Sequence, residues 1–191
     1  AEQNQSVFGI AIGAIAGQSS QGQHGIALGW AAGGWSQGEN SIAVGKAAGN
    51  NTQEANGIAI GNEAGMTRQG TYGIAIGMAA GVVDQDYAAI AIGLSAGRYN
   101  AQGNSAVAIG YNAGNDNQGN YTVALGTHSA TNDQSDGAVS IGDSAGRFSQ
   151  STYAVAVGGY AAHNDQGFKA TALGVEAGRN TQGQHTVAVG N

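Results

Sequence analysis

The sequence predicts an all-β fold, a parallel β-solenoid or β-roll of about twelve coils, each with 16 residues and two short strands. Three observations lead to this prediction: a strict internal repeat, an alternation of aliphatic residues with alanine inside it, and glycines at fixed positions in each copy. Because the repeat runs through the whole sequence, we expect residues 1–191 to form a single solenoid domain without separate caps.

The repeat unit reads small-Ile-Ala-Ile-Gly-x-x-Ala-Gly-x-x-x-Gln-Gly-x-x, beginning with Gly9-Ile10-Ala11-Ile12-Gly13. The glycine that closes the Ile-Ala-Ile element is present in all 12 copies, and so is the aliphatic residue before it. Successive closing glycines are 16 residues apart, except that Gly93 and Gly110 are 17 apart. The additional residue lies in the segment 98–101. Such regularity means that every copy occupies the same environment.

The Ile-Ala-Ile element alternates with period two, which is typical of a strand with one aliphatic and one alanine face. A helix is disfavoured, because each interior glycine costs about 1 kcal/mol relative to alanine. We expect two aliphatic columns to fill a thin core, opposite small residues such as Ala16, Ala32 and Ala48. The second strand of each coil is expected around Ala16 or around Gln21-Gly22.

A glutamine recurs once per repeat, starting at Gln5, and is interpreted as a structural row. Stacked amides can hydrogen-bond from coil to coil, or each amide can satisfy the backbone of its own loop. A catalytic role is excluded by the repetition itself. The predicted ladder consists of Gln21, Gln37, Gln53, Gln69, Gln85, Gln102, Gln118, Gln134, Gln150, Gln166 and Gln182.

Composition and charge exclude several classes of function. The net charge of −6 argues against nucleic acid as a partner, since phosphate binding needs a basic surface. No apolar run has the roughly 20 residues of a membrane span, so membrane insertion is not expected. Cysteine is absent, which excludes disulfides and thiolate metal sites. The four histidines are spread over distant coils, and no catalytic constellation is found; we expect no enzyme activity, cofactor or metal.

One copy of the repeat, Ser41-Ile42-Ala43-Val44-Gly45-Lys46-Ala47-Ala48, resembles the repeats of YadA-like heads of trimeric autotransporter adhesins. Similar repeats occur in phage tail fibres. The resemblance extends over essentially the whole chain, and it implies a left-handed parallel β-roll, often trimeric, on a cell or virion surface. The Ala-Gly pair and the strict glutamine are departures from that family's pattern.

Variable positions are where a binding function is expected. Met78, Leu94 and Tyr111 share one column in successive repeats and are a candidate lateral interface, as are Trp30 and Trp35 in a single repeat. Arg147, His163 and Arg179 share another column and are expected to form a short basic strip, either solvated or in contact with an anionic glycan.

The leading functional prediction is a secreted structural subunit, because both ends of the repeat array would present bare strand edges. Secretion is expected because the chain begins Ala1-Glu2-Gln3 without Met, as a cleaved protein does; a trimmed sequence would begin in the same way. The coils of this subunit would continue head to tail across molecules into an extracellular surface or biofilm-matrix filament, by β-augmentation at open strand edges. The expected partner is another copy. The alternative is an adhesive head of a trimeric surface adhesin or phage tail fibre, binding a cell-surface or glycan ligand. The predicted assembly interface comprises Gly9, Ile10, Ala11, Ile12, Val187, Ala188, Val189 and Gly190.

Overall fold

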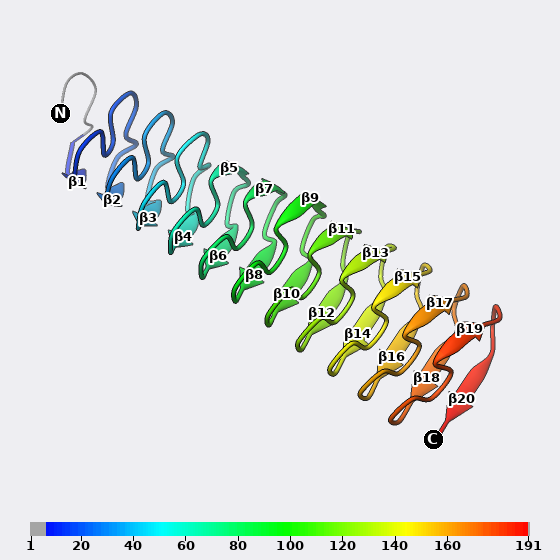
Figure 1. Cartoon of the computed structure of the whole chain (residues 1–191). Coiled ribbons are helices and arrows are strands. Elements are labelled where there is room, and N and C mark those ends of the chain that lie inside the picture. Colours follow the sequence, from blue (N-terminus) through cyan, green and yellow to red (C-terminus); the bar gives the residue numbers. More distant parts are fainter. Residues whose placement is uncertain (1–6, 191) are drawn as a thin grey trace.

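The computed structural model describes residues 7–190, and over this range it confirms an all-β solenoid without helix. The chain winds as a rod of stacked coils from one terminus to the other (Figure 1). Twelve strands lie side by side in one parallel sheet, so eleven turns of the solenoid separate the first from the last. Gln5 lies outside the described residues.

The larger sheet contains the Ile-Ala-Ile element of every repeat. Each strand pairs with its equivalent in the next coil without a shift, for example Ile74 with Ile90 and Ala75 with Ala91. Its strands are β1 (Ile10–Ile12), β2 (Ile26–Leu28), β3 (Ile42–Val44), β4 (Ile58–Ile60), β6 (Ile74–Ile76), β8 (Ile90–Ile92), β10 (Val107–Ile109), β12 (Val123–Leu125), β14 (Val139–Ile141), β16 (Val155–Val157), β18 (Thr171–Leu173) and β20 (Val187–Val189).

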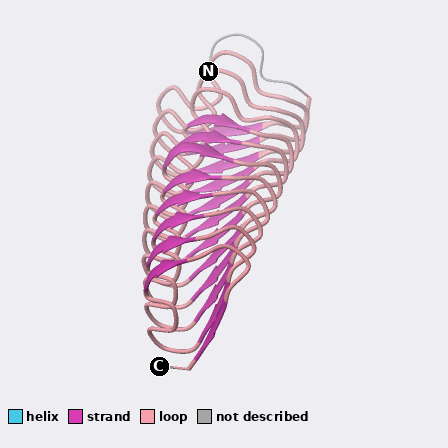
Figure 2. Cartoon of the chain, turned by 90° about the vertical axis from the view of Figure 1, so that its right-hand side faces the viewer, coloured by secondary structure: helices cyan, strands magenta, loops and turns pink. Residues whose placement is uncertain are grey.

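The smaller sheet has eight strands, each ending at the repeated glutamine, and it lies on the other side of the coils (Figure 2). The earlier coils carry only single bridges, which connect Gln21, Gln37, Gln53 and Gln69 in turn. The strands are β5 (Thr67–Gln69), β7 (Val83–Gln85), β9 (Tyr99–Gln102), β11 (Asp116–Gln118), β13 (Asn132–Gln134), β15 (Phe148–Gln150), β17 (Asn164–Gln166) and β19 (Asn180–Gln182).

The second strand therefore forms at the glutamine, while the segment around Ala16 is a turn. The glycine that follows each Ile-Ala-Ile element allows this turn to stack on its neighbour. Gly77 has φ of 126°, and a Cβ placed on it would lie 2.5 Å from the carbonyl oxygen of Gly93. Only glycine fits where two backbones approach so closely, which explains its presence in every copy.

The core is lined by alanine, and the expectation that two aliphatic columns fill it is wrong. Ala91 is fully buried, whereas Ile90 and Ile92 on either side are half-buried on the outer surface. The reason is the small separation between the two sides of a coil. A Cβ at Gly97 would lie 3.4 Å from the Cβ of Ala91 and 2.9 Å from Oε1 of Gln102. No isoleucine fits in that space, although the opposing alanines, such as Ala96, are buried as expected.

Candidate interaction surfaces

The glutamines predicted as a structural ladder all lie inside the coil, as a buried row between the two sheets. Gln69 illustrates their contacts: its Nε2 donates to the carbonyl oxygen of Ile58 at 2.8 Å and to that of Gly73 at 3.1 Å. It also lies 3.1 Å from Oε1 of Gln85 in the next coil. The side chain thus joins the two sheets of its own coil and connects that coil to its neighbour.

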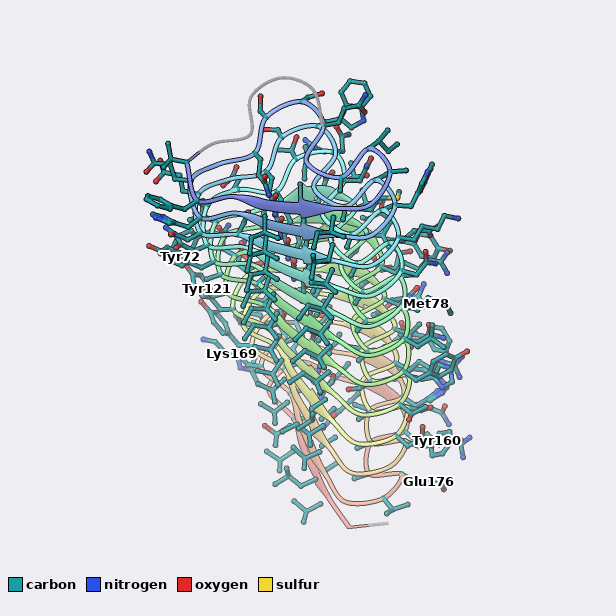
Figure 3. All side chains as sticks on the ribbon, turned by 90° about the vertical axis from the view of Figure 1, so that its left-hand side faces the viewer. Tyr72, Met78, Tyr121, Tyr160, Lys169 and Glu176 are labelled. Atoms are coloured by element: carbon teal, nitrogen blue, oxygen red, sulfur yellow. The ribbon has the colours of Figure 1, made fainter. Side chains whose placement is uncertain are left out.

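The outward-pointing residues of the larger sheet form a continuous aliphatic face, which the sequence analysis had assigned to the core. Two residues of each strand contribute to it, and 23 of the 24 are Ile, Val or Leu, with Thr171 as the exception. The face contains no charged residue. In Figure 3 these side chains stand in two rows on the ribbon of the sheet. We call this surface the aliphatic face; its rows are half-buried in most interior coils and more exposed at both ends.

The predicted lateral residues Met78, Leu94 and Tyr111 lie at the turn after the larger sheet and are 40–52% exposed. They do form a stripe, because they occupy one column of successive coils; Figure 3 shows Met78 on one edge of the rod, with Tyr72 and Tyr121 on the opposite edge. The stripe also borders an open hollow of about 430 Å³, which is described below.

Trp30 and Trp35 are both more than half exposed. The ammonium group of Lys46, from the next coil, lies 5.6 Å above the ring of Trp30. Trp30 occupies the column of Met78, whereas Trp35 follows the next turn of its coil and begins the approach to Gln37. Trp35 occupies the repeat position of Tyr99, which lines the same hollow as Met78 several coils further along the rod.

In the column of Arg147, His163 and Arg179, both guanidinium groups and the imidazole lie against aromatic rings. The guanidinium of Arg147 lies 5.0 Å from the centre of the Phe148 ring, and that of Arg179 lies 5.3 Å from the Tyr160 ring. Arg179 also forms an ion pair with Glu176, at 2.8 Å. Partial burial lowers the pKa of His163 from 6.5; its hydrogen bond to Asn164 opposes this, and both arginines add to it.

The residues predicted to mediate stacking lie on the two outermost strands, β1 and β20. Ile10, Ile12, Val187 and Val189 are 47–74% exposed, more than most of their equivalents in interior coils. Ala11 and Ala188 between them still pack against the alanine core. Each outer strand is paired on one side only among the described residues. Gly9 and Gly190 are not brought near one another, because they belong to opposite ends of the rod.

Within residues 7–190, no group of three or more His, Asp or Glu side chains is arranged to hold a metal ion. The histidines instead contact aromatic rings of their own or adjacent coils, as His128 does with Tyr111 at 5.0 Å. No helix long and apolar enough to cross a membrane is found among these residues.

The sequence analysis missed the aliphatic face because it placed those residues in the core. A signal was present: the inner column of the Ile-Ala-Ile element contains only Ala and one Ser, a uniformity that a narrow interior demands.

The comparison with protein-family models, curated proteins and solved structures finds no match to this chain. The surfaces of the solenoid are therefore interpreted from their own chemistry.

Proposed function

We propose that this protein is an extracellular structural module whose copies associate side by side through the aliphatic face, as in the head of a surface fibre. The observation that supports this proposal is the pair of half-buried rows of Ile, Val and Leu, broken only by Thr171, on the outer side of the parallel sheet. Large exposed apolar patches on soluble proteins are typically interaction sites.

The size of the aliphatic face is compatible with a second copy of this protein as the partner. Twelve strands at a spacing of about 4.8 Å extend over about 53 Å, and a width of about 10 Å gives about 500 Å² of surface. Two such faces bury about 1,000 Å² together, close to the lower limit for a specific interface. A second copy also supplies the same strand spacing, so the rows on both surfaces match along their whole length.

A structural role is further supported by the composition of the repeat. The most regular positions carry Gly, Ala and Gln, which build the coil. An extracellular location and adhesion to a surface ligand belong to this proposal as well; they rest on the resemblance to adhesin repeats.

Head-to-tail stacking into a filament is the second candidate. It is favoured by the identical pattern of β1 and β20, which lets the free edge of one pair with the other in the register that joins all interior coils. The two modes are compatible in geometry, because one uses the face of the sheet and the other its edges. They differ in the size distribution of the assemblies that they produce.

The oligomeric state of a variant on the aliphatic face tests the proposal. Ile58→Thr, Ile74→Thr and Ile90→Thr together retain β-branched residues, and the same column already accommodates Thr171. We expect the wild-type protein to sediment as a discrete oligomer and this variant as a folded monomer. A wild-type protein that is monomeric at high concentration would contradict lateral association, and long uniform fibres in electron micrographs would favour stacking.

A matched control distinguishes the aliphatic face from the stripe at the turn. The variant Met78→Thr, Leu94→Thr and Tyr111→Thr removes a similar number of exposed apolar side chains from a different surface. We expect it to keep the wild-type oligomeric state. If this variant is monomeric while the variant on the aliphatic face is not, the lateral interface lies at the turn.

A further inference from the structure

The coil with the additional residue is the most irregular one in the solenoid. Tyr99 pairs with Asp116 and Gln102 pairs with Gln118, so Asn100 and Ala101 together face the single residue between those partners. This arrangement is a β-bulge, which bends the strand and redirects its side chains. The glutamine row is also interrupted here: Oε1 of Gln118 is buried without a hydrogen-bond partner.

Open hollows border this bulge on both sides. The one of about 430 Å³ is lined by Arg98 and Tyr99 together with Met78, Leu94 and Tyr111, and two others border Ala101. In repeat proteins, an insertion into an otherwise strict repeat often lies on the binding face. The insertion and the hollow are independent observations, one from the sequence and one from the structure, and they coincide.

The lining of the larger hollow carries planar polar groups next to aromatic rings. Asn62, Glu63 and Asn112 supply amide and carboxylate groups to the lining, which also contains Tyr99 and Tyr111. Oδ1 of Asn62 is buried and has no hydrogen-bond partner, and the same is true of Nε of Arg98. Within the described chain, Arg98 is in no ion pair; its guanidinium lies 4.7 Å from the Tyr99 ring.

We propose that this hollow binds an uncharged pyranose unit of a glycan. Tyr99 and Tyr111 offer rings for the C–H face of a sugar, and the amides, Glu63 and Arg98 offer hydrogen bonds to its hydroxyl groups. The lining contains one cation and one anion, so its charges balance and favour a neutral, hydroxyl-rich ligand. Met78 and Leu94 give the remaining wall the apolar character that is common in small-ligand sites.

A coil without the insertion contains a similar arginine–aromatic pair and provides a control for the role of Arg98. Arg147 and Phe148 occupy the same repeat positions as Arg98 and Tyr99, with the guanidinium 5.0 Å from the ring and a buried, unpartnered Nε. The unpartnered Nε is thus common to Arg98 and Arg147 and does not distinguish them. What distinguishes Arg98 is the bulge and the hollow beside it. This site is separate from the aliphatic face, so the inference does not depend on self-association.

Binding to a glycan array tests the inference. The array carries neutral oligosaccharides of hexose and N-acetylhexosamine, together with sulfated and carboxylated glycans. We expect the full-length protein to bind neutral glycans, and Arg98→Ala or Tyr111→Ala to lower the apparent affinity at least about ten-fold. Arg147→Ala should stay within about two-fold of the wild type. Circular dichroism of each variant establishes that the solenoid is retained.

Deletion of Ala101 is a second test that leaves every proposed contact residue in place. It restores the 16-residue period and should remove the bulge, so we expect glycan binding to be lost while thermal stability is kept or raised. Three results would overturn the inference: no binding to any neutral glycan, binding only to acidic glycans, or an equal loss of binding for Arg147→Ala and Arg98→Ala. Retention of binding after the deletion would also contradict it.

Discussion

The inner and outer faces of the twelve-stranded sheet accept side chains of different size, although both faces are formed by adjacent residues of the same strands. The inner face is built from Ala11, Ala27 and their equivalents, with Ser140 as the one larger residue. The outer face accepts Ile, Val, Leu and Thr. The difference shows that the thickness of the coil, and not the hydrophobicity of a residue, decides which side chain points inward.

Enlarging an inner residue should have the largest effect on stability. Ala91→Leu places three additional carbon atoms between the sheets, where Gly97 and Gln102 already leave no room. Overpacking typically costs about 1–3 kcal/mol, and because Gly97, Ala96 and Gln102 enclose Ala91 closely, we expect the upper value, about 3 kcal/mol, in urea unfolding. Ile90→Leu, one residue away on the outer face, should change stability by no more than about 0.5 kcal/mol. Similar losses for both variants would mean that the two faces are equivalent.

A proline separates the role of the backbone from that of the side chains. In Ile74→Pro the strand loses the hydrogen bond from the Ile74 N–H to the carbonyl oxygen of Ala89, 2.9 Å long. The expected loss is about 3 kcal/mol, even though the side chain points outward. The measurement is the midpoint of thermal unfolding.

Val187→Pro is the control for that variant. Val187 occupies the position from which Thr171 donates to Thr186 of the following coil, and among residues 7–190 its strand β20 is paired only with β18. We therefore expect a much smaller loss of stability. The same substitution should interfere with head-to-tail stacking, because a stacked neighbour would need this donor. If fibres form at the wild-type rate with Val187→Pro, stacking through the edge of β20 is wrong.

Removing an interior glutamine should have an intermediate effect. Gln69→Leu leaves the carbonyl oxygens of Ile58 and Gly73 without their side-chain donor inside the coil. Unsatisfied buried polar groups cost about 1–3 kcal/mol, measured as the change in the free energy of unfolding. Gln21 lies in the first part of the row, and its Oε1 already lacks a partner. Gln21→Leu should therefore cost less, and an equal loss at both positions would show that contacts between coils contribute little.

The smallest predicted effect is a decrease in folding stability at acidic pH. Partial burial holds the pKa of His163 below 6.5, so the unfolded chain takes up the proton more readily than the folded one. The stability associated with neutral His163 is fully present above pH 6.5. It declines as the pH falls through the pKa of His163 in the folded protein. We expect the denaturation midpoint to drop slightly more between pH 7.5 and 5 in the wild type than in His163→Gln. An identical pH dependence in both would exclude His163 as a source of acid sensitivity.

Some of these interactions could be predicted from the sequence and others could not, depending on how their residues are spaced along the chain. The glutamine row could be predicted because its members recur every 16 residues and a solenoid places such residues above one another. The hollow at the bulge could not, because Asn62, Arg98 and Tyr111 come from three different coils whose side chains meet only in the folded rod. The one-residue insertion at 98–101 was visible in the sequence, but its consequence was not.

The sequence by itself determined the solenoid, the length of its coils and the strand at each Ile-Ala-Ile element, because periodicity of 16 and of two residues is a local property of the chain. Only the tertiary structure decided which side of that strand faces inward. Alternation with period two is the same for either orientation, and the answer depends on the distance to the opposite wall. Gly97 and Gln102 set that distance so that alanine is enclosed, and the larger residues Ile90 and Ile92 are left on the outer surface, where another molecule can reach them.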